Sequence, residues 1–253
     1  MDRSRFNVAI IACGAMLMVS AGNLNAAELR LLAGGAMSTV WADIKPQFEQ
    51  ASGHKLEIFF GTTPNLIKEA ASGKPFDIGV VPVEVMQDTS ARARFVTGPT
   101  TDIAHVGLGV AVRSDAQRPD ISTADALKAT LLKAQSIASI PASASGAQLA
   151  GIYERLGITN EMKAKTKAQP TPKEIVEAIA RGDAELAVFT LNVLIDPRLD
   201  IVGPFPAELQ REVVYAVGVA ANSKEPEAAK AFVNYLMSPS AIAVIKAKGM
   251  NPG

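Results

Sequence analysis

Aromatic residues are scarce in this chain of 253 residues, and neither sign of charge is in excess. Phe, Trp and Tyr make up 5% of the sequence, with Trp41 as the single Trp, so a platform for stacking bases or sugar rings is not expected. Lys and Arg number 25, and so do Asp and Glu. The resulting net charge of zero argues against a nucleic-acid-binding protein or a polybasic membrane-surface protein. A hydrophobic fraction of 48% indicates an ordinary globular protein with a substantial core.

Cysteine is almost absent, and the single Cys13 lies in the N-terminal segment. That segment starts with two arginines, continues as the apolar run Phe6–Ala21 and ends in small residues at Ala27. This order predicts a secretory signal peptide over residues 1–27, cleaved after Ala27; a retained membrane anchor is the alternative. The exported chain then contains no cysteine, which excludes disulfides and thiol catalysis. Export favours the periplasm of a Gram-negative cell.

Several signatures of catalysis and cofactor binding are also missing. The sequence contains no phosphate-binding P-loop and no G-x-S-x-G nucleophile motif. The stretch Gly107–Gly109 lacks the third glycine of a dinucleotide fingerprint. His54 and His105 are far apart and have no partner at metal-ligand spacing. We therefore expect no metal and no cofactor.

Short apolar strands alternate with amphipathic helices along the rest of the chain. The expected strands cover residues 29–33, 55–60, 77–81, 107–112, 136–140, 185–189, 200–202 and 213–220. The expected helices cover residues 37–52, 64–71, 122–133, 147–156, 171–181, 226–237 and 239–248. Thr63 is the expected N-cap of the second helix, and Thr171 opens a capping box with Glu174. Alternation of this kind predicts an α/β architecture with parallel sheets covered on both faces.

Three loops that follow strands share one chemistry. They are Gly34–Ser38, Gly61–Asn65 and Ser143–Ala147. Each combines glycine or alanine, which allow close approach of the backbone, with hydroxyl groups and the free N–H groups of a following helix. In open α/β sheets such loops lie beyond the carboxyl ends of the strands, where ligands bind. They predict a neutral cradle for an oxyanion or a carboxylate; plain helix capping is the alternative.

Charged side chains offer few further candidates. Arg113 follows the strand 107–112, where its guanidinium is placed to bind a carboxylate; the alternative is a solvated arginine in a turn. If the protein is an enzyme, a group that moves a proton is needed. Glu84, just after the strand 77–81, and His105 are the candidates for it.

Five stretches of the chain resemble periplasmic molybdate-type solute-binding proteins of ABC transporters. They are Leu29–Met37, Phe59–Thr63, Asp77–Pro82, Gly107–Arg113 and Ala228–Pro239. Their order and spacing extend the resemblance over essentially all of residues 28–253. It implies a type II periplasmic-binding-protein fold of two α/β lobes, each a mixed, mostly parallel sheet flanked by helices. Two crossover strands, near Val110–Arg113 and Val213–Ala220, then join lobe 1 (28–110 plus 218–253) to lobe 2 (111–217), and hinge closure clamps the ligand.

The resemblance also implies where the ligand binds. The implied binding residues are Gly35, Ala36, Met37, Thr62, Thr63, Ser143, Ala144, Ser145, Thr190 and Asn192. Molybdate binders usually have a serine where this chain has Ala36, and commonly a tyrosine where Thr190–Asn192 align. A missing hydroxyl leaves part of a tetrahedral oxyanion unpaired, which typically costs ~1–3 kcal/mol. The chain is therefore more similar to a divergent substrate-binding branch, which periplasmic aconitate isomerase also resembles.

Two functions follow as hypotheses. The first is a monomeric periplasmic protein that captures a small anion and passes it to an ABC-transporter permease in the inner membrane. The second is a cofactor-independent periplasmic isomerase of an unsaturated di- or tricarboxylate. The isomerase needs an anion clamp, for which Arg113 is the candidate, and a proton-moving group. No acid–base pair stands out in the sequence, which favours the binding protein.

Overall fold

The computed structural model describes residues 26–96 and 100–253. The predicted signal peptide therefore lies outside the described residues, apart from Ala26 and Ala27. The strands are β1 (Glu28–Gly34), β2 (Lys55–Gly61), β3 (Ile78–Pro82), β4 (Thr101–Arg113), β5 (Ile137–Ser139), β6 (Thr166–Ala168), β7 (Leu186–Thr190), β8 (Leu199–Pro204), β9 (Glu212–Val219) and β10 (Asn251–Pro252). The helices are the 3-10 turn η1 (Gly35–Met37), α1 (Ser38–Ser52), α2 (Thr63–Ala71), α3 (Val83–Gln87), α4 (Thr89–Arg92), α5 (Ala124–Lys133), α6 (Ala144–Leu156), α7 (Thr159–Lys165), α8 (Pro172–Ala180), α9 (Pro226–Leu236) and α10 (Pro239–Ala247).

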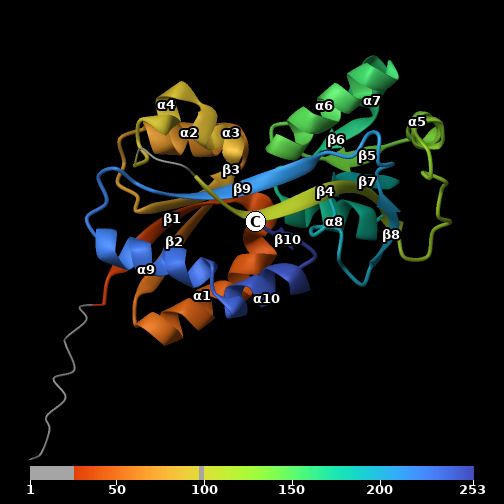
Figure 1. Ribbon diagram of the computed structural model, residues 1–253. Coiled ribbons are helices and arrows are strands. Elements are labelled where there is room, and N and C mark those ends of the chain that lie inside the picture. The colour runs from red at the N-terminus through yellow and green to blue at the C-terminus, as the bar shows by residue number, and fades with distance from the viewer. Residues whose placement is uncertain (1–25, 97–99) are drawn as a thin grey trace, which may run out of the picture.

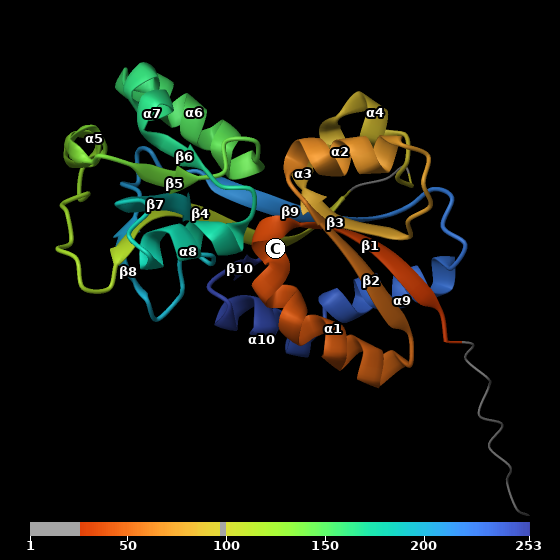
Figure 2. The same ribbon diagram turned by 180° about the vertical axis from the view of Figure 1, so that it is seen from behind.

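The molecule has two lobes, connected by the long strands β4 and β9 (Figures 1 and 2). In lobe 1, α1, α9 and α10 cover one face of the sheet, and α2, α3 and α4 lie on the other. In lobe 2, α5, α6, α7 and α8 flank a smaller sheet. The structure thus has the two α/β lobes and the two crossover strands that the sequence predicted.

The sheet is mixed, and its strand order is β2-β1-β3-β9-β4-β7-β5-β6, with β8 and β10 both paired to β4. The parallel pairs are β1–β2 and β1–β3 in lobe 1 and β5–β6 and β5–β7 in lobe 2. Every antiparallel pair involves β4 or β9. The first half of β4, up to Gly107, pairs with β9, and from Leu108 onward β4 pairs with β7. One strand therefore belongs to the sheets of both lobes, which the alternation of strands and helices does not show.

Local sequence explains how the helices start. Thr171 accepts a hydrogen bond from the Glu174 N–H at the start of α8, which confirms it as the N-cap. The Glu174 carboxylate accepts from the Thr171 hydroxyl (2.7 Å), whereas a capping box has it accept from the backbone N–H. At α2 the prediction was one residue late. The helix begins at Thr63, so Thr62, with extended backbone, is the N-cap, and Pro64 fits within the first turn.

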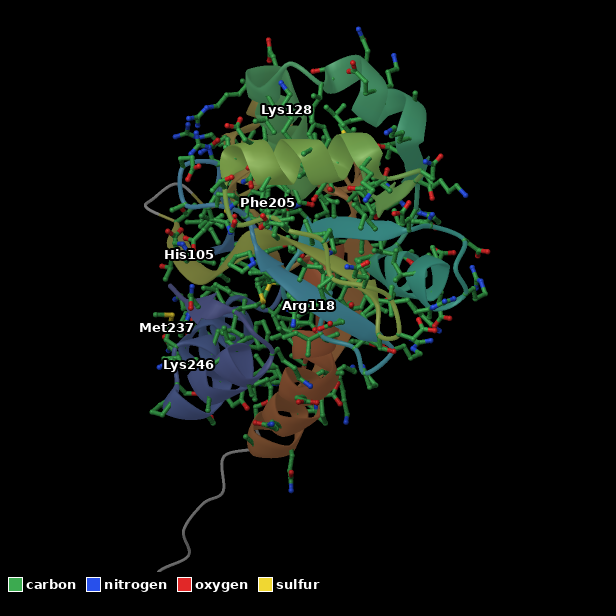
Figure 3. The ribbon with its side chains drawn as sticks, turned by 90° about the vertical axis from the view of Figure 1, so that its right-hand side faces the viewer. His105, Arg118, Lys128, Phe205, Met237 and Lys246 are labelled. Atoms are coloured by element: carbon green, nitrogen blue, oxygen red, sulfur yellow. The ribbon has the colours of Figure 1, made fainter. Side chains whose placement is uncertain are left out.

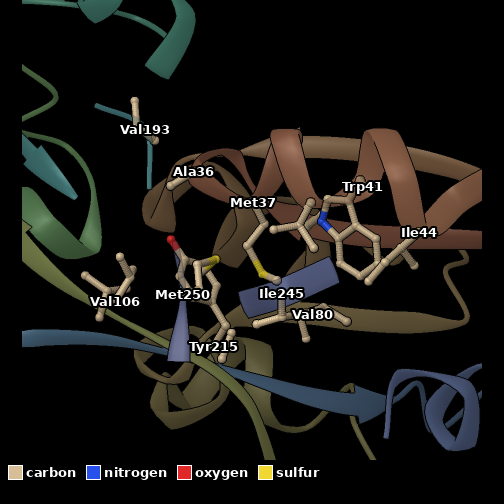
Figure 4. Packing of buried hydrophobic residues seen from close by; sticks show 14 of the residues in the cluster. Ala36, Met37, Trp41, Ile44, Val80, Val106, Val193, Tyr215, Ile245 and Met250 are labelled. Carbon is tan, nitrogen blue, oxygen red and sulfur yellow. The ribbon is translucent and has the colours of Figure 1, made fainter. Parts of the chain in front are cut away.

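A continuous apolar core connects the two lobes. The α1 stripe Val40, Trp41, Ile44 and Phe48 is buried, and the Trp41 ring lies 5.9 Å from that of Phe232 on α9. The same cluster extends past η1 to Val193 of lobe 2 (Figure 4). Separate clusters fill the α6 side of lobe 2 and the α2–α4 side of lobe 1. Among the described residues no single helix is long and apolar enough to cross a membrane, and α9 and α10 reach that length only as a pair bent by 59°.

Candidate functional site

A cavity of about 550 Å³ lies between the lobes. Its walls come from lobe 1 at the ends of β1, β2 and β3, and from lobe 2 at the starts of α6 and α8. All three sequence-predicted loops reach it. From these loops the lining includes Gly34, Gly35, Ala36, Ser38, Gly61, Thr62, Thr63, Asn65, Ser143, Ala144 and Ser145. The structure thus brings together loops as far apart in the sequence as Ser38 and Ser143, at the position expected from the strand-end rule.

Four helices begin at this cavity: α1 through its 3-10 turn, and α2, α6 and α8. The N-terminal N–H groups of a helix have no partner within the helix and carry a partial positive charge. Side chains cap α6 and α8, whereas η1 and α2 have no side-chain cap bond. No Asp or Glu is among the residues that line the cavity. The site is therefore electrostatically suited to an anion.

Hydroxyl groups supplement these amides. The Thr63 Oγ1 is buried and has no hydrogen-bond partner within the described part of the chain, because the cap position is taken by Thr62. Ser143 and Ser145 lie 2.9 Å apart through their Oγ atoms, and Ser145 is 3% exposed. Ser143 Oγ also donates to the Ile140 carbonyl (2.6 Å) and accepts from the Gly146 N–H (3.0 Å). Unlike Ser143 and Ser145, Thr63 therefore has a hydroxyl that makes no internal hydrogen bond in the described residues.

Tyr215 forms part of the cavity wall, and sequence analysis missed it. It lies on β9 and is 3% exposed. Its hydroxyl is directed toward the segment that carries Ala36 (Figure 4). Burial, together with the negative charge of Glu84, raises the pKa of the Tyr215 phenol above its ordinary value, so this hydroxyl is a proton-bearing donor at neutral pH. Tyr215 falls inside the expected strand 213–220, and nothing local in that strand shows which side chain meets the cavity.

The position of Tyr215 depends on a glycine. A Cβ added at Gly34 would lie 2.5 Å from Tyr215 Cε1 and 3.3 Å from Pro82 Cδ. Only glycine therefore leaves the ring in place at the end of β1. The sequence marked Gly34 as a residue for close approach of a ligand, and in the structure it admits a neighbouring aromatic ring.

Lys173 and two aromatic side chains complete the wall. Lys173 is the second residue of α8, and Phe60 and Phe189 are the last residue but one of β2 and β7. The sequence did not predict Lys173 as a site residue. It lies between Thr171 and Glu174, and local sequence indicates a role in helix capping only for those two residues. The lining combines one cation, neutral polar groups and apolar surface.

Three of the implied binding residues lie behind the cavity wall. Met37 is fully buried in the core, and Thr190 and Asn192 are 1% and 3% exposed; none of them is among the residues that line the cavity. Asn192 Nδ2 donates to the Ala36 carbonyl (2.7 Å). The Thr190 hydroxyl and the side-chain Oδ1 of Asn192 are buried without a hydrogen-bond partner in the described residues. These two side chains lie next to a lining residue, Phe189, rather than in the lining.

The charged candidates also lie outside the lining. Arg113 is at the end of β4, and its Nε bonds to Asp115, which lowers the pKa of the Asp115 carboxyl. His105 lies on the crossover strand β4 and is partly exposed (Figure 3), with Nδ1 3.5 Å from Glu212 and Nε2 3.8 Å from Asp102. Glu84, on α3, has one buried carboxylate oxygen without a partner among the described residues. Within residues 26–96 and 100–253, no group of three or more metal-binding side chains is found.

The sequence and the fold are similar to those of known bacterial proteins. A family model described as bacterial extracellular solute-binding protein matches residues 29–251. The chain is 33% identical to an aconitate isomerase from Pseudomonas sp., over 96% of this chain and 95% of that one. It is 28% identical to the molybdate-binding protein ModA of Azotobacter vinelandii, with 95% of each chain covered. The solved periplasmic molybdate-binding protein of Azotobacter vinelandii has the same fold, with a TM-score of 0.73 at 18% identity over 88% of this chain and 98% of that one.

Proposed function

This chain belongs to the bacterial extracellular solute-binding protein family, and we propose that it captures a small anion between its two lobes for an ABC-type importer. The observation that carries the proposal is the cavity itself. Four helix N-termini and several hydroxyl groups converge there, and no carboxylate side chain lines it. Such a site stabilises an oxyanion or a carboxylate through oriented dipoles.

Both lobes contribute to binding, which suits capture by hinge closure. Lobe 1 supplies Gly35, Ala36, Thr62 and Thr63, and lobe 2 supplies Ser143 to Ser145. The proposed lobes, residues 28–110 with 218–253 and residues 111–217, are joined through β4 and β9. Bending of these two strands brings the loops onto the ligand, and an anion that contacts both lobes favours the closed state by its differential affinity.

The proposed setting is the periplasm, reached by a cleaved signal peptide over residues 1–27. The partner in that setting is a permease of the inner membrane, and the binding protein acts as a monomer. The family description, which says extracellular, and the similar periplasmic molybdate-binding protein of known structure support the proposed setting. Residues 1–27 have the basic, apolar and small-residue order of an exported leader.

A thermal-shift panel on the exported protein tests the binding function. The panel contains molybdate, tungstate, sulfate, phosphate, and mono-, di- and tricarboxylates. A ligand at 100 times its Kd stabilises the folded state by about 2.7 kcal/mol. For a chain of this size that raises Tm by roughly 5–10 °C. A Tm unchanged by every anion in the panel would contradict the proposal.

A second candidate function is a cofactor-independent isomerase of an unsaturated tricarboxylate. It is favoured by the 33% identity to an aconitate isomerase and by Tyr215, whose protonated hydroxyl borders the cavity. Isomerisation needs a proton to leave one carbon and a proton to reach another, with no change in composition. Arg113, Glu84 and His105 lie outside the cavity lining, so Tyr215 replaces them as the residue to test.

The two functions are separated by an assay for conversion of cis-aconitate to trans-aconitate without added metal or cofactor. The isomerase predicts turnover, and Tyr215→Phe should lower kcat at least tenfold while leaving aconitate bound. A wild-type protein that binds aconitate without converting it is a binding protein only.

A further inference from the structure

Lys173 is the one cationic side chain among the residues that line the cavity. It is exposed, and it forms no ion pair within the part of the chain that the structure describes. Its neighbour Glu174 is occupied by Thr171, whose hydroxyl lies 2.7 Å from Glu174 Oε2. The Lys173 ammonium is therefore available to a ligand.

The position of this lysine is electrostatically unfavourable in the empty site. Lys173 is in the first turn of α8, where the partial positive charge of the helix N-terminus repels a cation. Capping does not require a lysine here, since Thr171 and Glu174 already bond to each other at the start of the helix. An anion in the cavity would turn this repulsive arrangement into an attractive one. A local rule broken at a cavity wall is typical of a functional residue.

The rest of the cavity indicates the shape of that anion. A volume of about 550 Å³ lies in the range of sites for organic ligands, roughly 300–1,000 Å³. Phe60, Ile140 and Phe189 add apolar wall, which a bare oxyanion does not need. The uncapped amides of η1 and α2 belong to lobe 1, whereas Lys173 belongs to lobe 2. The uncapped amides and the Lys173 ammonium, which both attract anions, thus belong to different lobes. The apolar side chains line the same cavity.

We infer that the ligand is an organic anion with at least two oxyanionic groups separated by a carbon chain. One group binds to the amides and hydroxyls of the loops, the carbon chain packs on the apolar wall, and the second group pairs with Lys173. This inference rests on the proposed anion-binding function and names the chemical class of the ligand. Lys173 is then the residue that selects dianions over monoanions.

Isothermal titration of the exported protein tests this inference. The probes are glutarate and succinate as organic dianions, acetate as a monoanion, and sulfate and molybdate as bare oxyanions. The variants are Lys173→Met, Lys173→Arg and, as a matched control, Lys163→Met at an exposed position of α7 outside the cavity lining. We expect at least one organic dianion to bind the wild type more tightly than acetate, sulfate or molybdate.

Lys173→Met should weaken that dianion about tenfold, the scale of one exposed charge-assisted hydrogen bond, and leave acetate affinity unchanged. Lys173→Arg should retain most of the affinity, and Lys163→Met all of it. Two outcomes overturn the inference while the proposed function stands: binding of sulfate or molybdate alone, or equal dianion affinity in Lys173→Met and wild type. A wild type that binds no probe overturns both.

Discussion

Asn192 of lobe 2 and Ala36 of lobe 1 are joined by a hydrogen bond of 2.7 Å from the side-chain Nδ2 to the main-chain carbonyl. Both residues are buried, at 3% and 6% exposure. Ala36 belongs to the first cavity loop, and Asn192 lies two residues after the end of β7, the strand that contains the lining residue Phe189. The bond therefore fixes the ligand loop of one lobe to the other lobe from behind the cavity. Asn192 acts as a positioning residue for this loop.

Replacing Asn192 by Ala removes this bond and leaves the Ala36 carbonyl buried without its partner. We expect a loss of stability of about 1–3 kcal/mol and weaker anion binding, because the loop is no longer held in place. Urea denaturation and titration with the best anion measure the two effects. Asn234→Ala, at an exposed position of α9, is the control and should change neither. Full affinity in Asn192→Ala would show that the bond does not position the loop.

Gly34→Ala should destabilise the protein and displace Tyr215 from its position in the cavity wall. The added methyl would meet Tyr215 at 2.5 Å, and relief of that contact requires the ring or β1 to move, typically at a cost of about 1–3 kcal/mol. Gly151→Ala is the matched control, since a Cβ there meets nothing within 4 Å; in a helix interior it should stabilise by roughly 0.5–1 kcal/mol. Calorimetry should show a lower Tm for Gly34→Ala and a higher Tm for Gly151→Ala than for the wild type. Only Gly34→Ala should lose affinity for the anion.

Thr63→Ala and Ser145→Ala should both weaken anion binding. Thr63 Oγ1 has no internal partner in the described structure, so its removal should leave Tm nearly unchanged and reduce affinity about tenfold, as expected for one lost hydrogen bond to an anion. Ser145→Ala also loses the contact to Ser143 and should lower Tm as well. Thr63→Ser, which keeps the hydroxyl, should bind like the wild type. Wild-type affinity in both alanine variants would exclude these loops from the site.

Glu49 stabilises lobe 1 at neutral pH, and this contribution is lost in acid. Its carboxylate accepts from Lys45 Nζ (2.7 Å) and from the Leu56 N–H (2.9 Å), which lowers its pKa to about 2 from 4.5. Because the folded pKa lies below the unfolded one, the contribution is fully present above pH 4.5 and is lost as the pH falls through about 2.

Glu49→Gln should therefore destabilise the protein at pH 7 by on the order of 1–2 kcal/mol, less than the full shift because Lys45 is exposed to solvent. The difference between variant and wild type, measured by denaturant unfolding, should shrink between pH 4.5 and 2. A difference that stays constant over this range would contradict the assignment.

Ala27 belongs to the folded body, although the sequence pattern assigned it to the leader. Its N–H donates to His54 Nδ1 (3.1 Å), its carbonyl accepts from the Lys55 N–H (2.8 Å), and it is 7% exposed. We predict that a protein beginning at Ala27 is more stable than one beginning at Glu28 by about 1–3 kcal/mol. Thermal unfolding of the two proteins measures this, and equal Tm values would contradict it.

The sequence by itself determined the elements and the loops. Alternating periodicity and capping patterns located the strands and most helices, because hydrophobic spacing and N-cap chemistry are local properties. The short elements α3, α4, α7, β6 and β10 were not predicted, since they have between two and seven residues and so carry little periodicity. Glycine, alanine and hydroxyl residues after strands identified the three loops of the cavity, because backbone amides at strand ends bind anions on any sheet of this type.

Only the tertiary structure decided which side chains complete the cavity. Tyr215 reaches it because β9 crosses between the lobes and turns one particular face toward Gly34, and Lys173 reaches it because α8 begins opposite the loops of lobe 1. Conversely, Arg113 and Asn192 are polar residues near strand ends, yet one turns to Asp115 and the other to the back of a loop. The direction of a side chain depends on strand pairing and lobe packing between residues far apart in the chain. No local pattern in the sequence contains that information.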